Sequence, residues 1–235
     1  MNQIQSHANL YEIKGNVEKI LKDLSVVKPI SEKSQNIAFC NPKGRILFSA
    51  WGYLNTKTNT LLIRVSAEAD SIFTNYIKKY LPLYRSTIKY LGTPKHSVSH
   101  DKSLLTIFNL GDYCEYYEVD VNSTDENFVK YKFISNKIID ITSENTEKFI
   151  PNYVIPALIS YDKGCYVGQE IIARLHYKAS IDSYVGYLKV NSELKVIESN
   201  LGQIISHVFF DNTWHYLYLV KKHEDLDKFL SSLDC

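Results

Sequence analysis

The sequence predicts an α+β protein in two parts, a larger unit over residues 1–180 and a small β-domain over residues 181–235. In the first part, short runs of strand-forming residues separated by turn signals occur together with amphipathic helical patterns, which predicts an antiparallel or mixed sheet accompanied by helices. After about residue 180 the pattern is strand-like until a closing helix. This second pattern is typical of a small closed or sandwich-like β-domain.

The first elements are expected to be a helix and a hairpin. Residues 16–24 place apolar side chains on one helical face, and Asn16 is a suitable N-cap. Strand-forming runs at 37–40 and 46–54 are separated by Asn41-Pro42-Lys43-Gly44, in which Pro and Gly occupy places that favour a turn. We therefore expect an antiparallel hairpin around this turn.

A strand at 60–65 and a second helix are expected next. Ser66 is a suitable cap for that helix, and apolar residues recur at helical spacing until Pro82 ends it. Lys78 and Lys79 lie in its last turn, where cations complement the helix dipole.

The middle of the chain is expected to be strand-rich. Gly92-Thr93-Pro94 is interpreted as a break between two strands, because both Gly and Pro interrupt regular structure. A partial apolar stripe predicts a helix at 125–138, and Pro151 and Pro156 exclude a continuous helix in the irregular segment before residue 163. The predicted strands are 86–91, 104–110 and 113–121.

The C-terminal part is expected to consist of strands closed by a helix. Asp211-Asn212 separates two strand-like runs and indicates a hairpin turn. Apolar residues from Leu226 to Leu233 predict the closing helix. The predicted strands are 184–190, 194–197, 203–210 and 213–220.

Composition excludes several functional classes. With 45% hydrophobic and 23% charged residues, the chain of 235 residues is globular and not disordered. A formal net charge of +1 gives no support for direct nucleic-acid binding, and no apolar run is long enough to span a membrane. The polar start of the chain lacks the core of a signal peptide, so we expect a cytoplasmic protein.

The cysteines do not form a metal-binding pattern. Cys40, Cys114, Cys165 and Cys235 are scattered and include no C-x-x-C pair, which argues against a zinc ribbon or a local cluster site. Cys40 and Cys114 lie in apolar runs and are expected in the core. The chain also lacks a P-loop and a G-x-G-x-x-G fingerprint, so ATP or dinucleotide binding has no support.

Cys165 has different surroundings. It lies in Lys163-Gly164-Cys165-Tyr166-Val167-Gly168-Gln169-Glu170, where two glycines permit a tight turn and a close backbone approach. An apolar stripe behind this segment predicts a helix that begins just after Cys165. The positive helix end and Lys163 both favour a thiolate. The alternative is a buried Cys that acts as a small hydrophobe, but the polar neighbours favour a functional thiol.

These residues resemble a known family. The segment from Lys163, continued by Ile171-Ile172-Ala173-Arg174, is similar to the signature K-G-C-Y-x-G-Q-E-x-x-A-R of the YgfZ family. Phe39-Cys40-Asn41-Pro42-Lys43-Gly44-Arg45 resembles a second motif of that family, and Phe149-Ile150-Pro151-Asn152 stands where the family has F-I-P-Q. The resemblance covers most of residues 10–190. Members are folate-binding relatives of the glycine-cleavage T-protein (aminomethyltransferase), implicated in tRNA modification and iron–sulphur enzyme maturation.

The resemblance implies a fold, a cofactor and partners. It implies a T-protein-like folate-binding unit followed by a C-terminal β-barrel-like domain, with tetrahydrofolate or a derivative between the Gly44–Arg45 turn and the Cys165 loop. Iron–sulphur enzymes or cluster-assembly proteins are the implied partners, and Cys165 is the implied reactive residue. The implied folate-binding residues are Lys163, Gly164, Tyr166, Gly168, Gln169, Glu170, Arg174 and Arg45.

The chain also departs from the T-protein pattern. Leu47 and Phe48 stand where that pattern has an acidic pair, and their side chains carry no proton. We therefore expect an accessory factor of iron–sulphur enzyme assembly or repair that is not an active aminomethyltransferase. The alternatives are a tetrahydrofolate-dependent one-carbon transferase and a degenerate folate-binding module. Arg45 could also be a solvated charge, and Glu170 and Arg174 could pair with each other.

Overall fold

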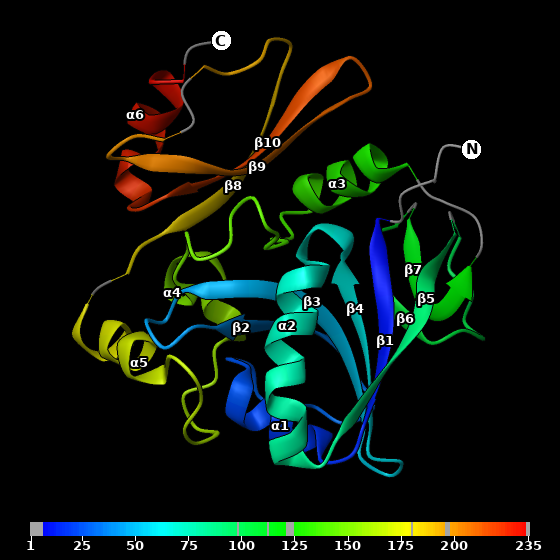
Figure 1. The fold of residues 1–235 in the computed structure, drawn as a ribbon. Coiled ribbons are helices and arrows are strands. Elements are labelled where there is room, and N and C mark those ends of the chain that lie inside the picture. The colour runs from blue at the N-terminus through cyan, green and yellow to red at the C-terminus, as the bar shows by residue number, and fades with distance from the viewer. Residues whose placement is uncertain are drawn as a thin grey trace.

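The computed structural model describes residues 7–97, 99–111, 113–120, 125–179, 181–195 and 198–233. It confirms an α+β protein with two antiparallel sheets (Figure 1). The strands are β1 Ala8–Lys14, β2 Ser34–Cys40, β3 Ile46–Asn55, β4 Thr60–Ser66, β5 Thr87–Ser97, β6 Thr106–Asn109, β7 Cys114–Asp120, β8 Tyr184–Val190, β9 Gly202–Phe210 and β10 Thr213–Val220. The helices are α1 Val17–Leu24, α2 Asp70–Tyr80, α3 Glu126–Ser135, α4 Pro151–Val154, α5 Gln169–Lys178 and α6 Leu226–Ser231, with 3₁₀ turns η1 Ala67–Ala69, η2 Leu81–Tyr84, η3 Pro156–Leu158 and η4 His223–Asp225.

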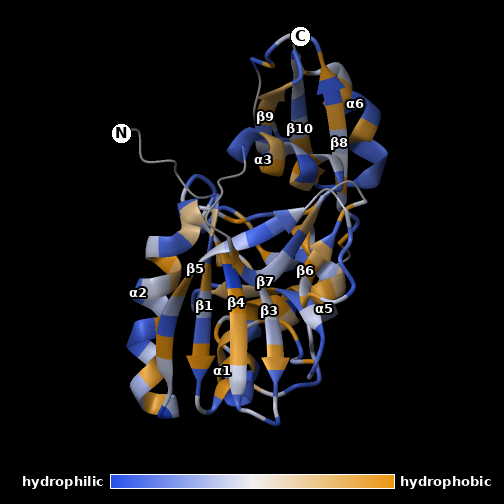
Figure 2. Ribbon diagram, turned by 90° about the vertical axis from the view of Figure 1, so that its right-hand side faces the viewer, coloured by the Kyte–Doolittle hydropathy of each residue, from blue (hydrophilic) through white to orange (hydrophobic). Residues whose placement is uncertain are grey.

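The larger sheet has the strand order β2-β3-β4-β1-β5-β7-β6. Figure 1 shows that its strands turn from one end to the other, so the sheet is strongly curled. Figure 2 shows apolar residues along its central strands. The main core lies between this sheet and helices α1 and α2, where Ile20, Phe39, Phe48 and Phe73 are all buried. Burial of these large apolar side chains stabilises the fold.

The predicted helices and first hairpin are confirmed, but their caps differ. Asn16 and Ser66 precede α1 and η1, yet neither side chain makes a capping hydrogen bond. Packing of the apolar faces therefore defines these helices more than the caps do. Strand β1 was not predicted from the sequence, although it pairs with both β4 and β5 in the larger sheet.

The predicted break at Gly92-Thr93-Pro94 is wrong, because β5 continues through it. The strand changes its partner there: it pairs with β1 up to Gly92 and with β7 from Thr93 onward. Gly92 has a φ of 131°, and a register shift follows Pro94. Gly and Pro therefore mark a bulged bend in one strand, which is the other place where these residues occur in sheets.

The smaller sheet has the open order β8-β10-β9, so a closed C-terminal barrel is not confirmed for the described residues. Asp211 and Asn212 have φ angles of 49° and 57°, as a two-residue hairpin turn requires. Leu194 and Lys195 are not in a strand, and the rest of that predicted strand, residues 196–197, lies outside the described residues.

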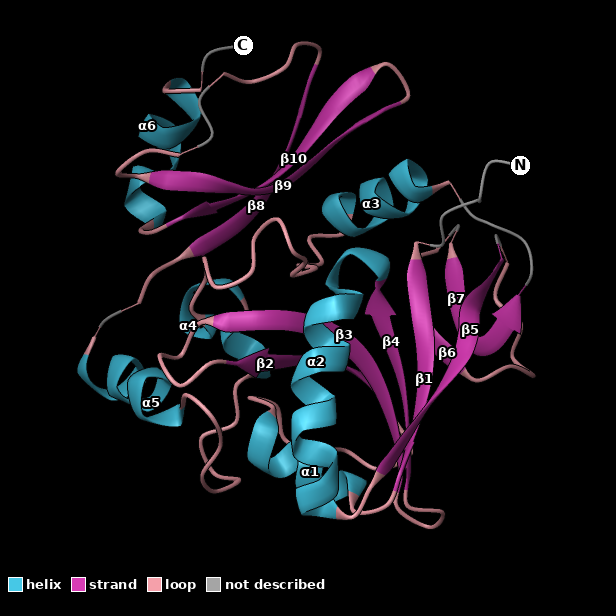
Figure 3. Cartoon of the chain, viewed as in Figure 1, coloured by secondary structure: helices cyan, strands magenta, loops and turns pink. Residues whose placement is uncertain are grey.

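Both faces of this smaller sheet are covered, although its strands do not close into a barrel. Phe229 of α6 packs with Tyr218 on one face, while Leu217 and Ile205 join the main core on the other. Figure 3 shows helix α3 between the two sheets. None of the helices in the described parts of the chain has the length and apolar composition needed to span a bilayer.

Candidate functional site

The segment 163–168, called the Cys loop here, packs against the C-terminal end of α1. The backbone N–H of Val167 donates to the carbonyl of Asp23 at 3.2 Å. Helix α5 begins at Gln169, directly after Gly168, as expected. A loop far away in the sequence is therefore fixed to the first helix of the fold.

Lys163 is the main anchor of the Cys loop. Its buried ammonium group donates to the carbonyls of Leu21 (3.2 Å), Lys22 (2.7 Å) and Ser25. These carbonyls lie at the end of α1, where helical carbonyls lack intrahelical partners. The Leu21 carbonyl also accepts from the backbone N–H of Ser25 at 3.1 Å. Burial lowers the pKa of Lys163 to about 7, against the attraction of Asp23. All three N–H donors of the ammonium are used in this anchor.

We predict that Lys163→Met destabilises the protein by about 2 kcal/mol, because the carbonyls of Lys22 and Ser25 at the end of α1 lose the ammonium donor. Lys43→Met is the matched control, since Lys43 is an exposed lysine in the neighbouring turn. Urea denaturation of both variants measures the difference. Equal stability of the two would show that Lys163 does not anchor the loop.

Gly168 brings the Cys loop into contact with the turn at Asn41–Gly44. A Cβ atom on Gly168 would lie 2.7 Å from the Asn41 carbonyl oxygen and 3.0 Å from Gly44 Cα. The close backbone approach expected from the glycines therefore occurs. The segment that the Cys loop approaches is the turn of the second motif, Phe39–Arg45. The two segments therefore touch at Gly168.

We predict that Gly168→Ala destabilises the protein by about 3 kcal/mol. The change combines an unfavourable positive φ of 84° with a clash against backbone atoms. Gly111→Ala is the control, because Gly111 has a φ of 82° but nothing within 4 Å of the added Cβ. That variant should lose only about 1 kcal/mol. Thermal melts of both variants give the share of the stability loss that comes from the backbone clash. Similar losses in the two variants would show that the clash contributes nothing.

Cys165 is exposed, whereas Cys40 and Cys114 are buried, as predicted for those two. Burial raises the pKa of the Cys40 thiol to about 12. The next residue, Tyr166, is buried, and the Lys163 ammonium lies 4.6 Å from its ring centroid. The loop thus buries Lys163 and Tyr166 and leaves Cys165 between them in solvent. Among the described cysteines, Cys165 is the accessible one.

The remaining residues of the signature lie on or before α5. Of the predicted apolar stripe, Ile172 is fully buried, whereas Val167, Ile171 and Leu175 are half-buried. Glu170 and Arg174 are exposed, and no ion pair between them occurs in the described residues. Gln169 is half-buried and Gly164 is exposed with a φ of 94°.

Arg45 lies in a separate cavity. Its Nη1 donates to the Lys148 carbonyl at 2.8 Å. Both residues line a cavity of about 460 Å³, together with Glu198 and Lys221, and Cys165 is not part of its lining. The structure therefore joins the two motifs through their backbones but separates Arg45 from the thiol.

This cavity, called the mouth here, is one of three adjacent cavities, each lined by residues of the segment 138–153 and of strand β9. It shares Lys148 and Phe149 with a cavity of about 240 Å³. That second cavity shares Glu144 and Ser206 with a third, which holds about 50 Å³ of open space. We call the three together the interface groove. Its total size is that of a small-molecule site.

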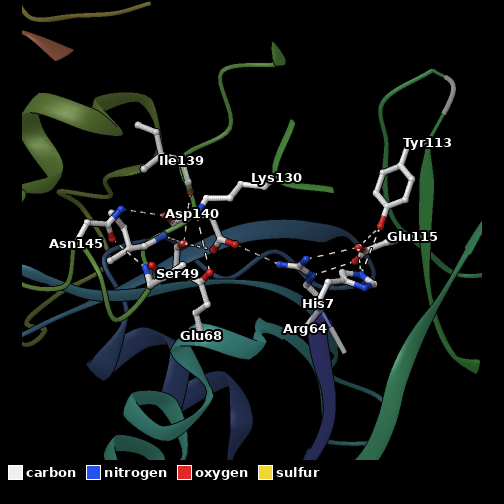
Figure 4. Close-up of polar contacts among 12 residues, drawn as sticks. His7, Ser49, Arg64, Glu68, Tyr113, Glu115, Lys130, Ile139, Asp140 and Asn145 are labelled. Atoms are coloured by element: carbon white, nitrogen blue, oxygen red, sulfur yellow. Dashed lines mark hydrogen bonds and ion pairs between the residues drawn. The ribbon is translucent and has the colours of Figure 1, made fainter. Parts of the chain in front are cut away.

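The inner end of the interface groove contains a buried ionic network, drawn in Figure 4. Arg64 Nε lies 3.0 Å from Glu115 Oε2. Glu115 Oε1 also accepts hydrogen bonds from His7 Nε2 (2.7 Å) and the Tyr113 hydroxyl (2.5 Å). Burial raises the pKa of Glu115, but Arg64, His7 and these hydrogen bonds outweigh it and lower the pKa to about 2. Glu115 is therefore an anion at neutral pH.

Asp140 joins this network at the groove wall. Its Oδ2 lies 3.7 Å from Arg64 Nη1, and its Oδ1 accepts from Ser49 Oγ at 3.2 Å. Burial raises the pKa of Asp140, although Arg64 and Ser49 oppose this. Ser49 directly follows Leu47 and Phe48 on β3. A carboxylate from another segment thus lies beside the strand where the expected acidic pair is missing.

Sequence reasoning missed the whole network. His7, Arg64, Glu115 and Asp140 belong to no local motif and come from four separate segments. One signal was available: Arg64 is a charged residue inside an apolar strand, and such a residue requires a buried partner.

No family model matches the chain. Over 68 residues, 28% of the chain, the sequence is 40% identical to the tRNA-modifying protein YgfZ of Buchnera aphidicola subsp. Schizaphis graminum (strain Sg), and this match spans 20% of that relative's length. The fold is similar to the crystal structure of the glycine cleavage system aminomethyltransferase T from Bartonella henselae, with a TM-score of 0.59 and 10% identity over 92% of this chain and 76% of that chain. The chain is therefore related to YgfZ in sequence and shares the fold of the glycine-cleavage T-protein.

Proposed function

We propose that the chain binds a reduced folate in the interface groove and acts as an accessory factor in the assembly or repair of iron–sulphur enzymes that modify tRNA. The observation that carries the folate part is the order of charge along the groove. Carboxylates outnumber cations at the inner end, where Glu68 and Asp140 lie, while Arg45, Lys148 and Lys221 surround the mouth.

Tetrahydrofolate has a complementary order of groups. Its pterin offers N–H donors, for which carboxylates are suitable acceptors, and its glutamyl carboxylates suit the cations at the mouth. His7 and Glu68 line the inner end, and their buried atoms His7 Nδ1 and Glu68 Oε2 have no hydrogen-bond partner among the described residues. Because the inner cavity holds only about 50 Å³, we place the pterin ring in the middle section, with its amino edge toward the carboxylates. Phe149 and Ile204 supply apolar contacts there.

The second part of the proposal concerns Cys165. The curated relative is named a tRNA-modifying protein, which supports a role in tRNA modification. Lys163, Tyr166 and Gly168 hold the Cys loop in place, and the exposed thiol is accessible to a partner protein. In this proposal Lys163 supports the loop instead of contacting the folate.

Titration calorimetry with tetrahydrofolate tests the folate part. We expect saturable binding that Arg45→Ala and Lys148→Ala each weaken about tenfold, since each loses a charged contact with a carboxylate. Lys43→Ala removes an exposed cation outside the groove and should bind like the wild type. An absence of both heat and thermal shift at millimolar tetrahydrofolate would refute the proposal, as would an equal loss in the control.

Asp140 favours a second candidate, a tetrahydrofolate-dependent one-carbon transferase. General acid–base chemistry needs a titratable group, and Asp140 supplies one beside β3. Ammonia and methylene-tetrahydrofolate are measured with an aminomethyl-lipoyl donor. Product formation that Asp140→Asn abolishes would establish the transferase, whereas a folate-binding protein without product would support the accessory role.

A further inference from the structure

The turn between β2 and β3 is organised by one residue, Asn41. Its side-chain Oδ1 accepts from the backbone N–H groups of Lys43 (2.9 Å) and Arg45 (3.0 Å). Its backbone N–H donates to the Arg45 carbonyl at 2.9 Å, and its carbonyl accepts from the Gly44 N–H at 2.9 Å. An Asn side chain that binds backbone groups two residues further on favours a turn. The shape of this turn, and the position of the Arg45 backbone, therefore depend on Asn41.

One side of the turn supports the Cys loop and α5. A Cβ atom on Gly168 would lie 2.7 Å from the Asn41 carbonyl oxygen. A Cβ atom on Gly44 would lie 3.1 Å from Ile171 Cβ. These distances leave no room for a further side chain between the turn and the start of α5, and Figure 1 shows the two next to each other. A displaced turn would therefore remove the surface against which Gly168 packs.

The C-terminal end of the turn reaches the mouth of the interface groove. Arg45 lines the mouth, and its Nη1 donates to the Lys148 carbonyl at 2.8 Å. The next residue, Ile46, donates its backbone N–H to the Phe149 carbonyl at 2.9 Å, and Phe149 also lines the mouth. The turn thus connects the Cys loop on one side with the wall of the groove on the other.

We propose that Asn41 is a positioning residue for both parts of the proposed function, on which this inference rests. It fixes the backbone of Arg45, so that the guanidinium is presented to the glutamyl carboxylates of the folate. It also holds the carbonyl against which Gly168 packs, so that the Cys loop keeps its shape. Asn41 is not among the residues that line the mouth, so it acts through its neighbours. Support of this kind keeps a binding group in its productive geometry.

Calorimetry with tetrahydrofolate measures the first role. Asn41→Ala should weaken binding about tenfold, because two backbone N–H groups lose their acceptor and Arg45 loses its fixed position. Asn41→Asp should restore most of the affinity, since a carboxylate oxygen accepts the same two bonds. In an Arg45→Ala background, Asn41→Ala should cause no further loss, because it acts through Arg45. A general structural effect would instead add to the loss caused by Arg45→Ala.

Hydrogen exchange followed by mass spectrometry measures the second role without any ligand. The backbone N–H of Val167 donates to the Asp23 carbonyl in the wild type and is protected by this bond. Asn41→Ala should raise the exchange rate of the Cys loop about tenfold, because the loop loses the support of the turn. Asn41→Asp should exchange like the wild type.

Asn55→Ala is the matched control. Asn55 Oδ1 also accepts from two backbone N–H groups, those of Lys57 (3.0 Å) and Thr58 (3.1 Å), in the turn at the other end of β3. Asn55 lines none of the three cavities of the interface groove. The control should therefore change neither the folate affinity nor the exchange of the Cys loop. Melting temperatures verify that each variant is folded.

The outcomes separate this inference from the folate proposal. If the wild type binds no tetrahydrofolate, the folate proposal and the first role of Asn41 both fail, and hydrogen exchange still decides the second role. If the wild type binds but Asn41→Ala and Asn55→Ala lose affinity equally, only the first role fails. Additive losses from Asn41→Ala and Arg45→Ala would have the same meaning. Unchanged exchange of the Cys loop in Asn41→Ala would refute the second role.

Discussion

Cys165→Ser is expected to abolish the activity of iron–sulphur tRNA-modifying enzymes in cells that lack the wild-type chain, while the melting temperature stays close to that of the wild type. Serine is nearly isosteric with cysteine, and the exposed Cys165 makes no contribution to the core. Stability should therefore change by less than about 0.5 kcal/mol. The loss of the nucleophilic sulphur, however, removes any thiol chemistry completely.

Native-state alkylation provides the independent measurement for Cys165. Iodoacetamide should modify Cys165 in the folded protein, whereas Cys40 and Cys114, both buried, should react only after denaturation. Cys235→Ser is a suitable background, because position 235 lies outside the described residues. Full complementation by Cys165→Ser together with an unreactive Cys165 would refute a functional thiol.

Arg64→Met is expected to destabilise the protein by about 3–5 kcal/mol, because it leaves the buried carboxylate of Glu115 without its main cation. Lys130→Met is the control. Lys130 also lines the groove, but its side chain is 28% exposed and its ion pairs with Glu68 and Glu144 are 3.9 and 3.7 Å long. Such a pair contributes less than about 1 kcal/mol. Denaturant titration of both variants separates the two effects.

The same network predicts how stability depends on pH. The pKa of Glu115 falls from 4.5 to about 2 on folding, so the folded state binds this proton more weakly than the unfolded state. The stabilisation that the ionised Glu115 gives the folded state is complete above pH 4.5 and is lost as the pH falls toward 2. The difference in unfolding free energy between the wild type and Glu115→Gln should shrink across this range. A difference that stays constant from pH 6 to pH 2.5 would contradict the lowered pKa.

Local patterns in the sequence determined much of the fold. The stripe of α1, the turn at Asn41–Gly44 and the turn at Asp211–Asn212 involve residues within a few positions of each other, so their sequences are sufficient to predict them. The Cys loop could also be predicted, because its two glycines and the start of α5 lie within a few consecutive residues. The exposure of Cys165 agrees with its polar neighbours.

Only the tertiary structure decided which distant segments meet. Lys163 lies 142 residues from Leu21, whose carbonyl it binds, and His7 lies 108 residues from Glu115. No local pattern encodes such pairs, since they depend on how the curled sheet brings its strands together. The family resemblance implied Lys163 as a folate-binding residue, and Leu47 and Phe48 stand where the T-protein pattern has an acidic pair. The folded chain uses Lys163 to anchor a loop and brings Asp140 beside β3, because buried charges and helix ends need partners wherever the chain can supply them.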